Sequence, residues 1–213
     1  EVVKSRYGLG GGQCLTLAEI GSRYDLSRER VRQIESATLA KIGAKFNSGP
    51  GADFVKSTVN ILKRFNGVRE EGMLLKADLR CAPADLNNIR FVLEAAGKFN
   101  YHPEDDNFYA HWYLDAGARK TALSFINRFR DQLNKNRAVA NRPTNPLEVN
   151  YVTLSKSFAF SPFGEFGLSE WPEIMPRSSR DWAYLVLKRE KQPLHFGALA
   201  EVISRHRQTK KRV

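Results

Sequence analysis

The chain is poor in cysteine and has no long apolar run. Its 213 residues include two cysteines, Cys14 and Cys81, which lie far apart in the sequence. This spacing excludes a disulfide-rich framework and is typical of the reduced thiols of a cytosolic protein. No stretch resembles a transmembrane helix, a signal peptide or a lipid anchor. We therefore expect a cytoplasmic protein with no membrane partner and with one to three small domains.

The residue patterns that catalysis needs are also missing. The glycine run Gly10 to Gly12 is not followed by the Lys-Ser/Thr pair of a phosphate loop. The acidic trio Glu104 to Asp106 is expected to form a solvated turn, with a weak cation site as the alternative. Neither cysteine has a partner at metal-ligand spacing. The four histidines are scattered, at His102, His111, His195 and His206. These absences favour a protein that is not an enzyme and has no metal or cofactor.

Negative charge is scarce relative to positive charge. The 34 Lys and Arg residues exceed the 23 Asp and Glu residues, which gives a net charge of +11 and a pI near 9.8. Such a balance favours phosphate backbones through counterion release, so a nucleic-acid partner is indicated. Ribosome-associated and membrane-surface proteins share this balance, and charge alone does not separate the three classes.

The stretch from Leu15 to Ile42 is the most informative part of the sequence and predicts a helix-turn-helix. Thr16 and Glu19 have capping-box spacing for a first helix from about Leu17 to Tyr24. Gly21 is a small residue where the two helices would cross. Asp25 occupies the turn, because Asp tolerates the left-handed conformation better than most residues. Ser27 is a good N-cap for a second helix from Arg28 to about Ile42.

The second helix has two distinct faces at about 100° per residue. An apolar face would pack on the first helix through Val31, Ile34, Thr38 and Ile42. Arg can pair with guanine, Gln with adenine, and Glu can accept from the cytosine amino group. Arg30 lies on the flank, where a phosphate contact is expected. The predicted DNA-binding residues are Ser27, Arg28, Glu29, Arg30, Arg32, Gln33 and Ser36. The alternative is a solvated charged helix face.

The stretch RYGLGGGQCLTLAEIGSRYDLSRERVRQIE resembles region four of the primary bacterial sigma factors. The resemblance covers roughly Val2 to Ile42. It implies recognition of the minus-thirty-five promoter element and docking on the β flap of RNA polymerase. By position, it implies base reading by Arg28, Glu29, Arg32 and Gln33 and a backbone contact by Arg30. Nothing here resembles the sigma region that melts the minus-ten element. The chain is then a fragment of a longer protein or a protein with this reader alone.

The part from Asp53 to Leu114 has the element order of a winged helix. Apolar residues at helical spacing predict a helix from Asp53 to about Phe65, and Pro83 begins another that reaches about Ala96. Two strands, 98–102 and 108–112, follow around a turn at 103–107. The candidate recognition helix offers Asn87, Asn88 and Arg90, but the wing tip is acidic and would be repelled by phosphates. We expect this unit to be architectural or to contact protein, with DNA contact as the alternative.

The remaining sequence predicts a connector and a partial second helix-turn-helix. A long helix is expected from Ala118 to about Asn136, whose Phe125 and Phe129 favour a core, with stacking on single strands as the alternative. An aromatic hairpin is expected within 151–168. The last stretch resembles the start of a HARE-type helix-turn-helix, with helices at 181–189 and 197–206. Arg205 to Arg207 and Lys210 to Arg212 form a basic tail that either contacts phosphates or is solvated.

The sequence thus predicts a mainly α protein with small β-hairpins, built from helix-turn-helix and winged-helix-like modules. The predicted domains are 1–46, 53–114, 115–175 and 176–213. The predicted function is a sigma-like transcription factor that recognises double-stranded promoter DNA and associates with bacterial-type RNA polymerase at the nucleoid. Two alternatives stay open: a DNA-targeting subunit of a restriction or defence system, and an accessory protein that docks on polymerase without reading DNA.

Overall fold

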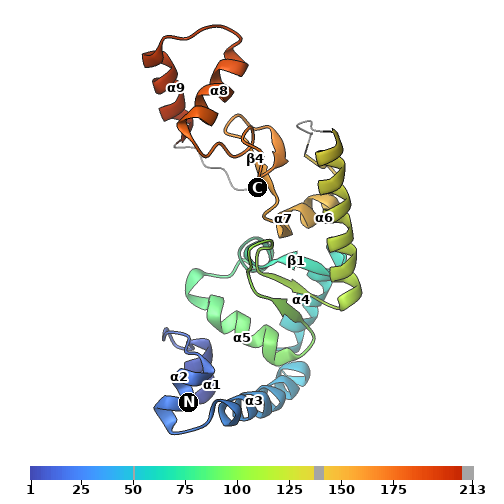
Figure 1. Cartoon of the computed structure of the whole chain (residues 1–213). Helices are drawn as coiled ribbons and strands as arrows, with labels where there is room; N and C mark the ends of the chain where they lie inside the picture. Colours follow the sequence, from blue (N-terminus) through green and yellow to red (C-terminus); the bar gives the residue numbers. More distant parts are fainter. Residues whose placement is uncertain (50, 137–141, 208–213) are drawn as a thin grey trace. The chain divides into compact units, whose positions relative to one another are not determined.

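The computed structural model describes residues 1–49, 51–136 and 142–207 and is mainly helical (Figure 1). It divides into two compact units. Unit 1 comprises 1–103 and 110–119, and unit 2 comprises 104–109 and 120–213. The described residues include no helix that is both long and apolar enough to cross a membrane. The predicted mainly α fold class with small hairpins is confirmed, whereas the four domain ranges stay a prediction.

Unit 1 begins with three helices. Helix α1 spans Val2–Tyr7, α2 spans Leu17–Tyr24 and α3 spans Arg28–Ser48. The first helix of the predicted helix-turn-helix has the expected bounds. The second is longer than expected, because it continues past Ile42 until Gly49 ends it. Gly49 and the proline after it are the first helix-breaking residues in this stretch apart from Gly43, and Gly43 is buried within the helix.

The rest of unit 1 has the order of a winged helix. Helix α4 (Ala52–Arg64) is followed by strand β1 (Val68–Glu70), the short π-helical segment η1 (Met73–Asp78) and the 3₁₀ turn η2 (Pro83–Asp85). Helix α5 (Leu86–Ala96), strand β2 (Asn100–His102) and strand β3 (His111–Tyr113) complete it. The antiparallel sheet has the order β1-β3-β2, with Arg69 and Tyr101 both opposite Trp112. The buried core lies between α4, α5 and this sheet and includes Val55, Leu62, Leu74, Leu93 and Trp112.

The described part of unit 2 contains an aromatic core and a helical pair. The unit boundary falls within helix α6 (Ala116–Asn136). Helix α7 (Pro146–Leu154) precedes a hairpin of β4 (Phe158–Phe160) and β5 (Phe166–Leu168). The hairpin predicted within 151–168 thus forms at 158–168, whereas 151–154 are helical. Asn145 caps this helix and Pro146 fits its first position. Phe125 and Phe129 stack on each other and contact the buried core residues Tyr151, Phe158 and Phe166, as a core role requires.

The end of the described chain forms two further helices in unit 2. Helix α8 spans Ser179–Glu190 and α9 spans Phe196–Arg207, close to the bounds expected for a HARE-type start. Ser178 and Asp181 form a capping box at the start of α8. Trp182, Leu185 and Val186 are buried on one side of α8. Of the predicted basic tail, Arg205 to Arg207 end α9, whereas Lys210 to Arg212 lie outside the described residues.

Candidate DNA-binding surface

Helix α2 and the turn after it have the geometry that the sequence predicts. The Thr16 hydroxyl accepts from the Glu19 amide at 3.2 Å, and the Glu19 carboxylate accepts from the Thr16 amide at 2.7 Å. The hydrogen bonds that the Thr16 amide and hydroxyl donate to this carboxylate hold the pKa of Glu19 below its usual value. Asp25 ends α2 in the left-handed conformation, with φ of 53°. A Cβ atom on Gly21 would lie 2.6 Å from the Leu26 carbonyl oxygen, so a glycine permits the close approach of turn and helix.

Helix α3 starts at a capped end and buries one side. The Ser27 hydroxyl accepts from the Arg30 amide at 3.1 Å, which satisfies one of the open donors of the first turn. Val31 and Ile20 are fully buried where α3 meets α2. Ile34, Thr38 and Ile42 are half-buried further along the helix. The beginning of α3 is therefore fixed against α2 while its other side remains accessible.

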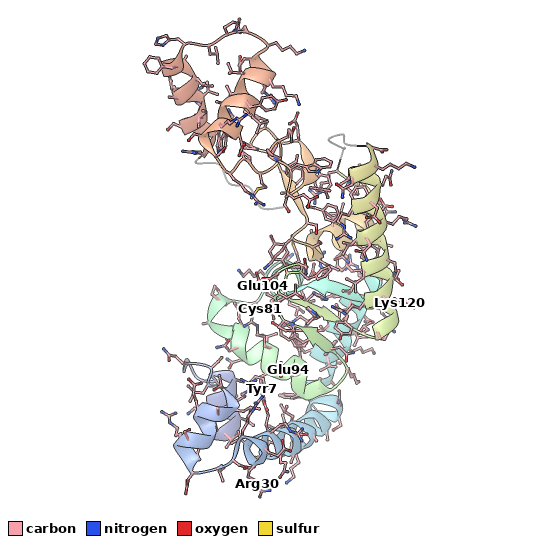
Figure 2. The ribbon with its side chains drawn as sticks, in the orientation of Figure 1. Tyr7, Arg30, Cys81, Glu94, Glu104 and Lys120 are labelled. Carbon is pink, nitrogen blue, oxygen red and sulfur yellow. The ribbon has the colours of Figure 1, made fainter. Side chains whose placement is uncertain are left out.

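The exposed side of the α3 N-terminal half contains all the predicted DNA-binding residues. Arg30 lies on the side of α3 that faces away from α5 (Figure 2). The seven exposed residues are Ser27, Arg28, Glu29, Arg30, Arg32, Gln33 and Ser36. We call this set the reading face. It presents guanidinium, amide, hydroxyl and carboxylate groups, which suit base edges and phosphates.

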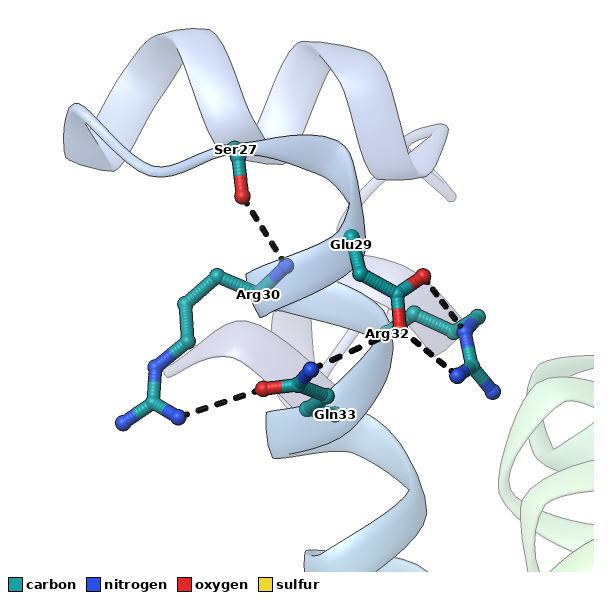
Figure 3. Close-up of polar contacts among 5 residues, drawn as sticks. All are labelled: Ser27, Glu29, Arg30, Arg32 and Gln33. Atoms are coloured by element: carbon teal, nitrogen blue, oxygen red, sulfur yellow. Dashed lines mark hydrogen bonds and ion pairs between the residues drawn. The ribbon is translucent and has the colours of Figure 1, made fainter.

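Four side chains of the reading face form one chain of hydrogen bonds (Figure 3). Arg32 donates from Nε and Nη2 to the two carboxylate oxygens of Glu29, at 2.9 and 2.7 Å. Gln33 donates to Glu29 at 3.5 Å and accepts from Arg30 at 3.3 Å. The bonds with Arg32 lower the pKa of Glu29 and raise that of Arg32, so both groups are charged at neutral pH. The reading face is thus ordered by its own side chains.

The C-terminal half of α3 is packed against α1 and α5 of the same unit. Buried Val3, Phe91 and Ala95 form a core with partly buried apolar residues of these helices and of the turn after α1, namely Tyr7, Leu9, Leu39, Ile42, Phe46 and Val92. Tyr7 and Glu94 lie next to each other between α1 and α5 (Figure 2), where the Tyr7 hydroxyl donates to the Glu94 carboxylate. Sequence reasoning missed this packing, although a glycine inside a helix, Gly43, is a signal of close approach.

The candidate recognition residues of the winged-helix-like unit do not form one exposed face, because Arg90 and Asn87 are partly buried. Arg90 donates from Nε to Glu71 at 2.8 Å, and the buried Glu71 also accepts from the Trp112 indole at 3.2 Å. Asn87 lines a small pocket of about 220 Å³ between α1, α3 and α5, together with Arg6, Tyr7, Cys14, Glu35, Arg90 and Glu94. Asn88 is exposed. The apolar side of α5 and its arginine are therefore used inside unit 1.

The expected wing tip belongs to unit 2. Asp105 accepts from the Asn107 and Phe108 amides at 2.8 and 2.7 Å, which closes a tight turn. Lys156 makes an ion pair with Glu104 at 2.7 Å, and its amide donates to the Asn107 carbonyl at 2.9 Å. The acidic trio thus forms a paired structural turn. Among the described residues, no group of three or more His, Cys, Asp or Glu side chains is placed to hold a metal ion.

A capped helix, a left-handed turn and a second helix with an exposed polar face define the helix-turn-helix class of DNA-binding modules. Within that class, residues 1–43 match the model of the family described as sigma-70, region 4. The match ends at Gly43, five residues before α3 ends. The expected resemblance of this part of the chain is therefore confirmed.

Curated relatives match the same short part of the chain. The chloroplastic RNA polymerase sigma factor sigF of Arabidopsis thaliana is 47% identical over 47 residues, which cover 22% of this chain and 9% of that protein. RNA polymerase sigma-C factor of a Nostoc species is 57% identical over 42 residues, 20% of this chain and 10% of its own length. The chain thus spans about a tenth of these relatives. No solved structure matches it significantly.

Proposed function

We propose that this chain acts as a sigma-like transcription protein whose reading face recognises a promoter element in double-stranded DNA. The observation that carries the proposal is the exposed, mutually hydrogen-bonded reading face at the start of α3, within the residues that match sigma-70 region 4. Arg28, Glu29, Arg32 and Gln33 contact base edges. Ser27 and Arg30 hold the phosphate backbone, and Ser36 lies at the end of the contact.

The partners follow from the names of the relatives. Both relatives are RNA polymerase sigma factors, so the proposed element is the one near minus thirty-five, and the proposed protein partner is a bacterial-type RNA polymerase. The net charge of +11 favours the same nucleic-acid partner. The protein acts without catalysis of its own and is located at the nucleoid of the cytoplasm. The domain ranges of the sequence analysis belong to the same proposal.

The experiment is fluorescence anisotropy of the whole chain on two duplexes across a salt series. One duplex has a consensus minus-thirty-five hexamer and the other a scrambled hexamer of the same composition. A preference for the first that persists as salt is raised supports base reading. Equal, steeply salt-dependent affinities would contradict it, because charge alone then accounts for binding. Polymerase core is added in a parallel titration to test the proposed protein partner.

A second candidate is a DNA-targeting subunit of a restriction or defence system. It is favoured by α8 and α9, whose bounds lie close to those expected for the start of a HARE-type module. The two functions predict different partners for the same chain. Affinity purification of the whole chain from its native cell separates them, since co-purification of polymerase supports the first and co-purification of a nuclease supports the second.

A further inference from the structure

Helix α3 is one continuous helix that contains both the reading face and the contact with α1 and α5. Its 21 residues begin with the reading face and end in the core shared with α1 and α5. Figure 1 shows α3 running from α2 to the region below α5. A straight helix rises about 1.5 Å per residue, so the direction of its far end determines where its first turns lie. A contact that fixes residues 39–47 therefore also fixes the reading face.

At Gly43, the backbones of α3 and α5 approach so closely that no side chain fits between them. A Cβ atom on Gly43 would lie 2.0 Å from the Ala95 carbonyl oxygen, so the α3 backbone rests directly on the end of α5. One turn further on, the side-chain amide of Asn47 donates from Nδ2 to the Ala96 carbonyl at 3.0 Å. The carbonyls at the end of a helix have no partner inside it, and Asn47 satisfies one of them. These two contacts set both the spacing and the register of the two helices.

Helix α1 closes the contact from the other side. The Tyr7 ring packs edge-on against Phe91 of α5, with ring centroids 5.1 Å apart. Burial and the hydrogen bond to the Glu94 carboxylate raise the pKa of Tyr7, so its hydroxyl remains a donor at any physiological pH. Arg6 joins α1 to α3 through Glu35 at 3.3 Å. The three helices are thus tied by apolar and polar contacts together.

Helix α5 is in turn anchored in the core of the winged-helix-like unit. Leu93 and Ala96 belong to the core with Leu62, Leu74 and Trp112. Arg90 ties the helix to Glu71 beside β1. The element that would enter a DNA groove in a winged helix therefore lies between two protein cores.

We propose that the winged-helix-like unit is a brace: α5 holds the C-terminal half of α3 and so positions the reading face, and the unit does not itself contact DNA. Gly43 and Asn47 are positioning residues in this role. The inference rests on the proposed function, because it assumes that α3 reads DNA. It assigns to the larger part of unit 1 a task that the match to residues 1–43 does not cover.

The test compares two brace variants with a core control in the whole chain. Gly43→Ala forces α3 away from Ala95, and Asn47→Ala removes one hydrogen bond. Ile174→Ala is the control, since Ile174 is fully buried in unit 2 and belongs neither to the core of α1, α3 and α5 nor to the core that anchors α5. Circular dichroism and thermal unfolding first establish a temperature at which all variants are folded. Anisotropy on the consensus and scrambled duplexes is then measured there.

We expect Gly43→Ala to raise the Kd for the consensus duplex by about tenfold or more and to reduce its preference over the scrambled one. Asn47→Ala has a smaller effect in the same direction. Ile174→Ala lowers the unfolding temperature but leaves Kd within about twofold, because effects of sites without shared partners are independent. If folded Gly43→Ala binds like the parent, or Ile174→Ala loses preference to the same extent, the brace is wrong. Loss of binding by Asn88→Ala would also overturn it.

A second readout tests the brace without DNA. Spin labels are placed at the exposed positions Ala37 and Lys98 of a chain in which Cys14 and Cys81 are serine. We expect one narrow distance in this background and a broader or shifted distribution when Gly43→Ala is added. An unchanged distribution would refute the brace. A parent chain that shows no base preference refutes the proposed function instead. The spin-label distances then test by themselves whether α5 positions α3.

Discussion

Arg32 donates two parallel hydrogen bonds to the carboxylate of Glu29, although both side chains lie on an exposed helix surface. The pair leaves Nη1 of Arg32 and its outer edge directed away from Glu29, which is the geometry needed for an end-on contact to guanine. In the proposed function, Glu29 therefore orients an arginine as well as accepting from a base. The two residues should act on DNA as a coupled pair.

The coupling can be measured with a double-mutant cycle on DNA affinity. Arg32→Ala should weaken binding to the consensus duplex about 5- to 150-fold and relax specificity at one base pair. Glu29→Gln keeps the shape of the side chain but removes the charge that holds Arg32. We expect the double variant to lose less than the sum of the two single losses. Additive losses would show that the two side chains act on DNA independently.

Arg30 should affect affinity without affecting specificity. It lies on the flank of the reading face, and its guanidinium bonds with Gln33 at the rim of the hydrogen-bonded chain. We expect Arg30→Ala to weaken binding to consensus and scrambled duplexes by the same factor. The slope of log affinity against log salt should fall by about 1, since one phosphate contact is lost. A change confined to the consensus duplex would instead make Arg30 a base-reading residue.

Arg90 should matter for folding and not for base preference. Its removal takes the ion-pair partner from the buried carboxylate of Glu71, to which the Trp112 indole still donates at 3.2 Å. We expect Arg90→Ala to lower the free energy of unfolding by about 1–3 kcal/mol, measured by urea denaturation. Adding Glu71→Gln should recover part of the loss, because the unpaired charge is then gone. Parent-like stability of Arg90→Ala would show that the pair contributes little.

The cap of α8 predicts a pH-dependent contribution to stability. Backbone and side-chain hydrogen bonds from Ser178 hold the pKa of Asp181 below its usual 3.8. A depressed pKa in the folded state stabilises the fold above the unfolded value and loses that effect as pH falls through the folded value. Asp181→Asn should therefore lower the unfolding temperature at pH 7 but not at pH 2. A difference of equal size at both values would assign the effect to packing.

Local signals made the geometry of the helix-turn-helix predictable from the sequence. The capping box of Thr16 and Glu19, the left-handed Asp25 and the N-cap Ser27 each depend on residues close in the chain. The order of α4, α5 and the small sheet was predictable for the same reason. The HARE-type resemblance stays a prediction, because the bounds of α8 and α9 alone do not identify that family.

The features that the sequence did not predict depend on contacts between residues that lie far apart in the chain. Arg90 pairs with Glu71, 19 residues away, a partner that the local sequence of α5 does not predict. Helix α3 continues beyond Ile42 because Phe46 and Asn47 find partners on α5. Residues 151–154 are helical although their aromatic and β-branched side chains favour strands, since Asn145 and Pro146 start a helix whose end is buried. In each instance tertiary contacts override local preference.

The turn from Glu104 to Tyr109 has a consequence for synthesis. It belongs to unit 2, where the Tyr109 amide donates to the Leu154 carbonyl and Phe108 pairs with Ser155. Strands β2 and β3 on either side of this turn belong to unit 1, so the segment emerges from the ribosome well before its partners. The strands of unit 1 can pair as soon as they are made, whereas Leu154, at the end of α7, is added 45 residues after Tyr109. The first segment of unit 2 is therefore synthesised before unit 1 is complete. A ribosome that stalls between Tyr109 and Leu154 leaves this segment without its partners in the rest of unit 2.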